Sequence, residues 1–319
     1  MDIEVSMPSN SVTSNNKANN NTQQLYIGID GGGSKCKAVL MDENNNLLGT
    51  GIAGPGNPLH GFEQATNSIT QSALLALKDA NLEHVALNEL IAGVGLAGVN
   101  LPVLFEQMDN WQHPFKQMFL ATDLLIACLG AHQGEDGAVM ISGTGSCGFS
   151  YVDQKSLIVG AHGFPHGDKA SGAWFGLQAA KQVLLSLDGL VEPTAMSQKL
   201  LTLLNCPDDV ALVEAIANKP ATYYAKFANL VFDAAEEGDS NAKAIISEGC
   251  EYINNVANKL WQQKPSRMSI IGGLTTRLVK WLPEDLSCRL SEPVSPPEVG
   301  AVLFAKQQLA LPNKQKLTV

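Results

Sequence analysis

Two short glycine-rich segments constrain the fold of this chain more than any other feature. One follows an apolar run at residues 25–29, the other an apolar run at residues 138–141, and each leads into a further run of strand-forming residues. Glycine permits positive φ angles and close approach, so a strand, a glycine turn and a second strand direct several backbone N–H groups at one point. Two such units predict two similar half-molecules that hold the phosphates of one nucleotide from opposite sides.

Length and charge narrow the class of protein. The chain has 319 residues, which suits two domains better than one core. A formal net charge of −10 argues against nucleic acid or an anionic membrane as a partner, and no apolar stretch approaches the length of a membrane span. An anionic nucleotide stays compatible with this charge, because it needs only local backbone donors and a metal ion.

The N-terminal segment is polar and rich in Asn and Ser, without the basic start and apolar core of a signal peptide. We therefore expect a disordered tail over residues 1–24 and a cytoplasmic protein. The six cysteines have no C-x-x-C spacing, so we expect buried or bystander thiols rather than a disulfide framework or a zinc site.

The pattern of apolar runs and turns predicts a duplicated unit. Its first copy has three strands joined by short turns, a helix, and two buried parallel strands with a helical connection, at residues 25–30, 36–42, 47–53, 62–80, 90–96 and 118–121. Three short strands recur at residues 138–141, 147–151 and 157–159. Helices follow, including 171–187, 221–236 and 241–261, and then a strand at 268–271 and a closing helix at 298–309. We interpret this as βββαβα, stated twice.

Two carboxylates stand at the ends of predicted strands. Asp30 lies at the mouth of the first glycine turn, where it could hold Mg²⁺ directly or through water, or simply close an Asx turn. Asp123 lies at a strand-to-helix junction at the seam of the two halves. It could act as general base toward an alcohol, its charge stabilised by the helix N-terminus, or be an ordinary N-terminal acid.

Three further positions carry candidate binding groups. Thr144 and Ser146 offer hydroxyl and N–H groups to a phosphate, or belong to a plain hairpin. Asp168 precedes the helix at 171–187 and could contact substrate hydroxyls or a metal, although Asp168 or Ser171 could equally cap that helix. Gly272-Gly273 follows a buried strand and could let an adenine ring approach the backbone.

In this order, these pieces resemble the sugar kinase/Hsp70/actin ATPase superfamily. Within it the chain is similar to the BadF/BadG/BcrA/BcrD-type group, and more closely to bacterial N-acetylglucosamine and glucosamine kinases. The resemblance spans about residues 25–310, and its most specific motifs cover residues 28–34, 121–123, 129–132, 142–146, 167–176, 272–274 and 297–301. The chain departs from the family at Ser34, where Thr is common, and at Lys169, where an acid is common.

The resemblance implies an α/β fold of two actin-like (ribonuclease H-like) domains with a nucleotide cleft between them. It implies domains over residues 25–121 and 122–297, with 298–319 returning to the first as a closing helix. The implied ligands are ATP, Mg²⁺ and a small amino sugar, and a homodimer is the one protein partner that we consider.

The resemblance also implies a role for each site residue. Asp30 organises Mg²⁺, and Asp123 accepts the proton of the sugar 6-hydroxyl. Asn57, Thr144 and Asp168 bind the sugar. The phosphates are held by Gly31, Gly32, Gly33, Ser34 and Lys35 and by Gly143, Thr144, Gly145 and Ser146, and the adenine pocket is lined by Gly272 and Gly273.

The activity expected from this resemblance is phosphorylation of N-acetylglucosamine by ATP at the 6-hydroxyl. The segment 164–180 is more similar to the N-acetylglucosamine enzymes than to the glucosamine ones. A glucosamine or glucose kinase of the same fold is the first alternative. A second is an ATP-driven activator protein with an iron–sulfur cluster, for which Cys128 and Cys147 would be the candidate ligands. A sugar-responsive regulator would need a DNA-binding extension, which this acidic chain lacks.

Overall fold

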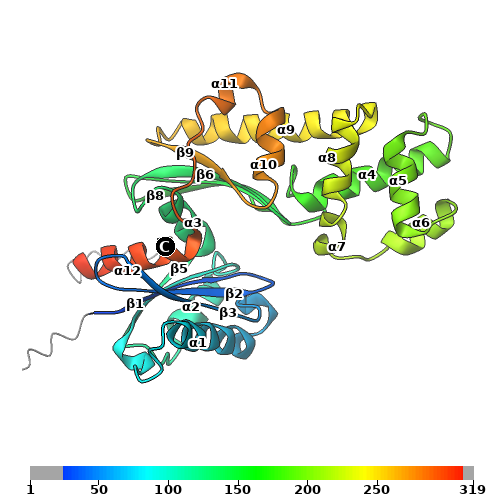
Figure 1. Ribbon diagram of the computed structural model, residues 1–319. Helices are drawn as coiled ribbons and strands as arrows, with labels where there is room; N and C mark the ends of the chain where they lie inside the picture. The colour runs from blue at the N-terminus through cyan, green and yellow to red at the C-terminus, as the bar shows by residue number, and fades with distance from the viewer. Residues whose placement is uncertain (1–23, 312–319) are drawn as a thin grey trace, which may run out of the picture.

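The computed structural model describes residues 24–311, so the predicted tail at 1–24, apart from its last residue, and the segment 312–319 lie outside the described part of the chain. The described residues form two sheets with helices around them (Figure 1). The first sheet has the strand order β3-β2-β1-β4-β5 and the second the order β8-β7-β6-β9. The predicted α/β class is therefore confirmed.

Each sheet begins with a three-stranded antiparallel meander. In the first sheet it is formed by β1 (Tyr26–Gly31), β2 (Cys36–Met41) and β3 (Leu47–Ala53), and β4 (Ile91–Leu96) and β5 (Gln117–Thr122) add in parallel beside β1. In the second it is formed by β6 (Gly137–Ser142), β7 (Ser146–Val152) and β8 (Lys155–Gly160), and β9 (Met268–Ile271) adds in parallel to β6. The two glycine turns are the β1–β2 and β6–β7 connections.

Helices of the first half cover its sheet closely. The short 3-10 helix η1 (Pro58–His60) and α1 (Phe62–Asp79) follow β3, α2 (Pro102–Asp109) connects β4 to β5, and the 3-10 turn η2 (Leu87–Glu89) precedes β4. A Cβ added at Gly51 of β3 would lie 2.0 Å from the Ser72 carbonyl oxygen of α1, so this glycine sets the distance between helix and strand.

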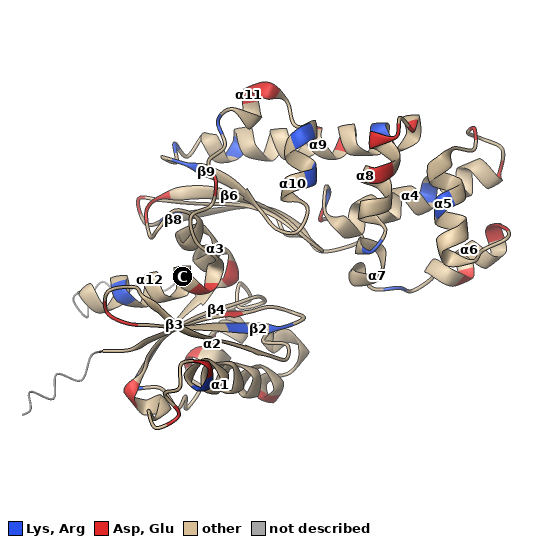
Figure 2. Ribbon diagram, viewed as in Figure 1, with Lys and Arg blue, Asp and Glu red and all other residues tan. Residues whose placement is uncertain are grey.

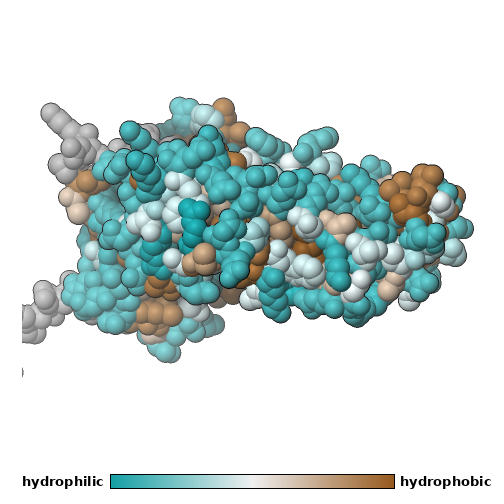
Figure 3. All heavy atoms as spheres, turned by 90° about the horizontal axis from the view of Figure 1, so that it is seen from above, coloured by the Kyte–Doolittle hydropathy of each residue, from teal (hydrophilic) through white to brown (hydrophobic). Residues whose placement is uncertain are grey.

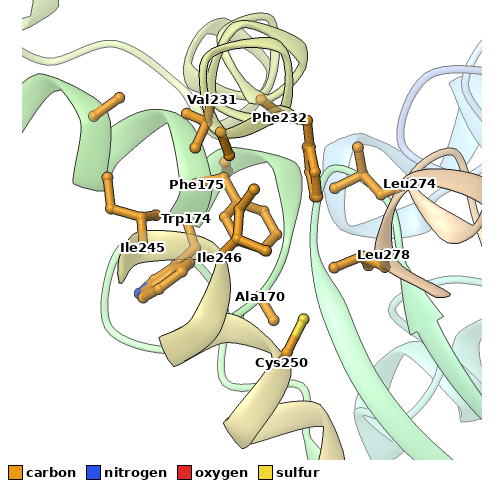
Figure 4. Packing of buried hydrophobic residues seen from close by; sticks show 14 of the residues in the cluster. Ala170, Trp174, Phe175, Val231, Phe232, Ile245, Ile246, Cys250, Leu274 and Leu278 are labelled. Atoms are coloured by element: carbon orange, nitrogen blue, oxygen red, sulfur yellow. The ribbon is translucent and has the colours of Figure 1, made fainter. Parts of the chain in front are cut away.

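A helical insertion lies between β8 and β9. It comprises α4 (Gly172–Leu187), α5 (Ala195–Leu204), α6 (Asp209–Ile216), α7 (Ala221–Ala225), α8 (Ala228–Glu236) and α9 (Ser240–Trp261). Its core packs Phe175 at the centre of a cluster with Trp174 and Phe232 (Figure 4). Figure 3 shows an apolar patch on the surface at the far end of the insertion. Exposed apolar residues of the insertion include Leu190, Leu203 and Val210.

The helix expected at 221–236 is two helices, α7 and α8, and this prediction was wrong in that respect. Lys226 and Phe227 donate their N–H groups to the carbonyls three residues earlier, which tightens the chain between α7 and α8. The Tyr224 carbonyl lies where a Cβ of Gly176 on α4 would be, 2.0 Å from that position. This close contact between α7 and α4 ends the first helix before the second begins.

Two helices, α3 (Asp123–Ala131) and α12 (Pro297–Ala310), lie between the two sheets (Figure 1). Helix α12 packs on β1 and β4 of the first sheet, and its Gly300 approaches the Ile126 carbonyl of α3 so closely that a Cβ there would be 1.9 Å away. Helix α3 contacts both sheets and is buried after its first residue. The division into domains at residue 122 stays a prediction.

The remaining short helices are α10 (Thr275–Leu278), η3 (Val279–Trp281) and α11 (Glu284–Ser287). In Figure 2 the acidic and basic residues are distributed as short, separate segments over both halves of the molecule. Within residues 24–311, no helix combines the length and the apolar character that crossing a membrane requires.

Candidate active site

Asp30 and Asp123 face one cavity of about 660 Å³ between the two sheets. Asp30 lies at the end of β1 and Asp123 begins α3, directly after β5, as the sequence predicts. The parallel strands β1, β4 and β5 end at the same edge, and Gly95 of β4 lies opposite Asp30 on one side and Ala121 on the other. A Cβ at Gly95 would lie 2.3 Å from the Ile126 side chain, so this glycine lets α3, which begins at Asp123, pack against β4.

The two carboxylates influence each other. Burial and the neighbouring Asp123 charge raise the pKa of Asp30 to about 7. Burial likewise raises the pKa of Asp123, although its carboxylate accepts the Leu124 N–H at 3.0 Å. The helix N-terminus does stabilise the Asp123 charge through the Leu124 N–H, as expected, but the effect of burial on the pKa is larger. A carboxylate with a raised pKa is a stronger proton acceptor.

The first glycine turn leaves open space in front of it. Gly32 donates its N–H to the Lys35 carbonyl at 2.9 Å, and Gly33, Ser34 and Lys35 are exposed. A Cβ at Gly32 or Gly33 would meet no atom closer than 3.7 Å. Backbone donors of this turn are thus accessible from the solvent side.

The second glycine turn is tied to the segment that precedes α4. The Ser142 hydroxyl donates to the Ala170 carbonyl at 2.8 Å, and the Ser146 hydroxyl to the Lys169 carbonyl at 2.6 Å. The Gly143 carbonyl accepts the Gly172 N–H at 2.7 Å. The Ser146 side chain is therefore occupied by a neighbouring carbonyl, and its predicted contact with phosphate stays a prediction.

A second cavity, of about 1080 Å³, brings together three of the predicted sugar-binding residues. Asn57, Thr144 and Asp168 line it, with Gly145 between the last two. Asp123 lines the other cavity. The β6–β7 hairpin borders both cavities, since Ile141 lines the first and Thr144 and Gly145 line the second.

The structure gives Asp168 and Asn57 different local roles. The alternative that Asp168 or Ser171 caps α4 is confirmed at Ser171, which accepts the Trp174 N–H at 3.1 Å, so Asp168 is not the cap. Asp168 has a left-handed φ of 57°. Burial raises the pKa of its carboxyl, and the nearby backbone N–H groups of Ser146 and Gly163 offset part of this effect. Asn57 does cap a turn, since its Oδ1 accepts the Leu59 N–H at 2.9 Å, and it lines the cavity as well.

Sequence reasoning missed the wall of this second cavity that comes from the helical insertion. Phe164, Leu177 and Tyr224 supply an apolar surface there, and Lys219 a cation. These residues form no motif with constant spacing, because they come from a loop, from α4 and from the α6–α7 region. Phe164 and Tyr224 contact each other in the folded protein, with ring centroids 5.2 Å apart, and so form one continuous part of this wall.

Gly272 and Gly273 follow β9, beside the second turn. Gly272 has a φ of 114° and lines the first cavity, and a Cβ there would lie 2.3 Å from the Ser142 carbonyl oxygen. A Cβ at Gly273 would meet nothing within 4 Å. A flat group could approach this backbone, but the adenine contact itself stays a prediction.

The cysteines offer no cluster site in the described part of the chain. Burial raises the pKa of both Cys128 and Cys147 to about 12, which keeps these thiols protonated. No group of three or more His, Cys, Asp or Glu side chains within residues 24–311 is arranged to hold a metal ion. Cys128 and Cys147 are buried thiols, as predicted.

Comparison with known proteins decides the family, since residues 27–305 match the BadF/BadG/BcrA/BcrD ATPase family. The chain belongs to this family. As one of its members, it is 31% identical over 280 residues to the glucosamine kinase GspK of Vibrio cholerae, covering 88% of this chain and 95% of that protein. It is 28% identical over 237 residues to the N-acetylmuramic acid/N-acetylglucosamine kinase of Clostridium acetobutylicum, covering 72% and 77%.

Solved structures confirm the fold of this family member. The "Putative N-acetylglucosamine Kinase" from Chromobacterium violaceum superimposes with a TM-score of 0.82 at 28% identity, covering 89% of this chain and 99% of that one. A ROK family glucokinase from Streptomyces griseus, solved with glucose and AMPPNP, gives 0.54 at 19% identity, covering 89% and 99%. The predicted actin-like fold is thus confirmed.

Proposed function

We propose that this protein transfers the γ-phosphoryl group of ATP to the 6-hydroxyl of N-acetylglucosamine. Similarity to kinases of glucosamine, N-acetylglucosamine and N-acetylmuramic acid supports an amino-sugar acceptor. The observation that carries the proposal is that Thr144 and Gly145 of the second glycine turn also line the cavity of Asn57 and Asp168. A phosphate held by this turn would therefore lie beside an acceptor in that cavity.

In the proposed reaction the sugar 6-oxygen attacks the γ-phosphorus, the bond from that phosphorus to the ADP oxygen breaks, and the hydroxyl proton passes to Asp123. The raised pKa of Asp123 makes its ionised carboxylate a stronger proton acceptor. Asn57 and Asp168 would hold sugar hydroxyls, and the N–H groups of both glycine turns would hold phosphates. Gly272 and Gly273 would face the adenine.

The residues around Asp30 fit a hard cation. Two carboxylates, Asp30 and Asp123, face one cavity and repel each other, and Asp30 forms no ion pair with any described residue. Mg²⁺ usually takes one or two protein carboxylates and completes its shell with water and phosphate. Asp30 would hold it, and the ion would neutralise charge on the transferring phosphates.

The acetylated sugar suits the second cavity because its wall is apolar at Phe164, Leu177 and Tyr224, where an acetyl methyl group could pack. Glucosamine is the second candidate, favoured by the 31% identity to a glucosamine kinase. Its protonated amine would need an acceptor, and among the described lining residues only Asp168 is a carboxylate, while Lys219 would repel it.

A coupled ADP-release assay over four sugars tests this proposal, with N-acetylglucosamine, glucosamine, glucose and N-acetylmannosamine as acceptors. We expect the highest kcat/KM for N-acetylglucosamine, and glucosamine to improve relative to it in Lys219→Met. Higher kcat/KM for glucosamine in the parent protein would move the assignment to the second candidate. ADP release that does not depend on any of the four sugars would overturn the kinase proposal.

A further inference from the structure

The motif at residues 297–301 has no role in the site described so far, yet it places a buried carboxylate beside Asp30. Glu298 lies in the first turn of α12 and is 2% exposed. Its neighbours Pro296 and Pro297 line the same cavity as Asp30 and Asp123. Its charge contributes to raising the pKa of Asp30, so the two carboxylates are close.

The close approach of α12 to β1 explains how a residue so late in the chain reaches this place. A Cβ at Gly28, two residues before Asp30, would lie 2.0 Å from the Glu298 carbonyl oxygen. No larger residue at position 28 would allow the first turn of α12 to lie against the strand. Gly28 therefore positions Glu298 next to the first glycine turn.

Glu298 forms an ion pair with Lys37 of β2, and this pairing is unexpected from the sheet register alone. Lys37 lies directly opposite Asp30 in the β1–β2 ladder. Side chains of directly opposed residues point to the same face with Cβ atoms about 5 Å apart, and an acid and a lysine there usually attract each other. Instead, Lys37 pairs with Glu298, and Asp30 forms no ion pair with any residue of the described chain.

We propose that Glu298 is a positioning residue that draws the Lys37 ammonium away from Asp30 and so keeps Asp30 available to a divalent cation. Without Glu298, Lys37 would turn to its cross-strand neighbour and compete with the cation for the same carboxylate. This proposal rests on the proposed function, in which Asp30 faces Mg²⁺. In this proposal a residue of α12, which lies late in the sequence, controls the charge beside the first glycine turn.

Metal binding in the absence of sugar tests the proposal. Free Mn²⁺ is measured by electron paramagnetic resonance while the full-length protein is titrated with the ion in the presence of ADP. In Glu298→Gln the Mn²⁺ dissociation constant should rise about tenfold, because an ammonium beside a carboxylate lowers its affinity for another cation by about this factor or more. Glu237→Gln, which breaks the distant Lys199–Glu237 pair, is the matched control and should leave Mn²⁺ binding unchanged.

The double variant Lys37→Met/Glu298→Gln separates positioning from general damage. It removes both charges, so Lys37 no longer competes for Asp30, while the Lys35 charge near Asp30 is the same in every variant. Its Mn²⁺ affinity should therefore return to that of Lys37→Met. A merely structural ion pair predicts instead that the double variant binds Mn²⁺ no better than Glu298→Gln. That result, or parent-like affinity in Glu298→Gln, would overturn the proposal.

Two further measurements keep the outcome clear. If Glu298→Gln does not fold by circular dichroism, Glu298→Asp replaces it, since this variant keeps the charge but withdraws it by one methylene. A smaller loss of Mn²⁺ affinity is then expected, and parent-like affinity would again overturn the proposal. Because no sugar is present, a negative sugar assay with these Mn²⁺ results intact would defeat the proposed reaction and leave the role of Glu298 standing.

Discussion

The two glycine turns look alike in sequence but differ in how the rest of the molecule holds them. The β1–β2 turn closes on itself through the Gly32–Lys35 hydrogen bond, and its tip is exposed. The β6–β7 turn is held by Ser142 and Ser146, whose hydroxyls donate to the segment before α4. The Gly32 carbonyl also accepts the Gly56 N–H at 2.9 Å. The first turn is thus tied to the loop after β3 through backbone groups, whereas side-chain hydroxyls join the second turn to the segment before α4.

This difference separates two tasks. The first turn adjoins Asp30 and the cavity that Asp30 shares with Asp123, so two carboxyl groups dominate its surroundings. The second adjoins Asp168, which lines the acceptor cavity together with Thr144 and Gly145 of this turn, so its surroundings connect the proposed phosphate site to that cavity. The duplicated unit therefore supplies similar backbone at both turns, while the surrounding contacts give each turn a different role.

The largest expected effect of a substitution is a loss of kcat at Asp123. Asp123→Asn keeps the size of the side chain but removes the group that would accept the 6-hydroxyl proton. The value of kcat should fall by about 10²–10⁴-fold with little change in sugar affinity. Steady-state kinetics with calorimetric sugar binding measures both, and activity within a few-fold of the parent would exclude Asp123 as the base.

The pH dependence of the free energy of unfolding tests whether Asp30, beside the first turn, has a raised pKa. Its folded pKa of about 7 exceeds the ordinary value of 3.8, so the folded protein binds the proton more tightly than the unfolded chain does. The parent should therefore lose stability as pH rises from about 4 to about 7, whereas Asp30→Asn should not suffer this loss. The stability advantage of the variant should grow by about 3 kcal/mol between pH 5 and pH 8.

Urea unfolding of the metal-free protein at the two pH values gives this difference directly. A constant offset between parent and Asp30→Asn would show that Asp30 has an ordinary pKa. The same variant should need more Mg²⁺ for activity, whereas its calorimetric affinity for sugar should stay close to that of the parent. Lost sugar affinity with unchanged Mg²⁺ dependence would place Asp30 on the acceptor side.

Gly145→Ala tests the coupling at the second turn. Its Cβ would lie 2.8 Å from the Asp168 Oδ2, so the acceptor carboxylate must move. We expect kcat/KM for the sugar to fall by about 100-fold, as a displacement of a positioning group near 1 Å can produce. Gly33→Ala in the first turn is the control, because its nearest neighbour would be 3.7 Å away, and it should leave sugar KM unchanged. Equal effects of the two variants on sugar KM would contradict the distinction between the turns.

The smallest effect is expected at Asn57. Asn57→Asp keeps the oxygen that accepts the Leu59 N–H, so the cap and the fold should survive. It removes the two amide donors, and the sugar KM should rise about tenfold, which corresponds to one hydrogen bond in a binding site. A thermal unfolding curve and a sugar titration separate the two roles. Parent-like sugar KM would leave Asn57 as a turn residue only.

Local sequence signals determined the strand meanders, both glycine turns and the positions of Asp30 and Asp123 at strand ends. These signals are short in range: alternating or continuous apolar runs, glycine at turns, and a carboxylate directly after a strand. These signals gave a wrong prediction, or none, wherever the structure depends on contacts between segments that are distant in the sequence. The break between α7 and α8 depends on Gly176 of α4, and the raised pKa of Asp123 depends on its burial.

Only the tertiary structure decided what surrounds each site residue. In the folded chain the Ser146 hydroxyl donates to the Lys169 carbonyl, and Phe164 and Tyr224 lie on one wall of the acceptor cavity. Lys37 likewise pairs with Glu298 rather than with its cross-strand neighbour. Partners separated by up to 261 residues leave no periodic trace in the sequence, because their proximity follows from packing α12 against β1.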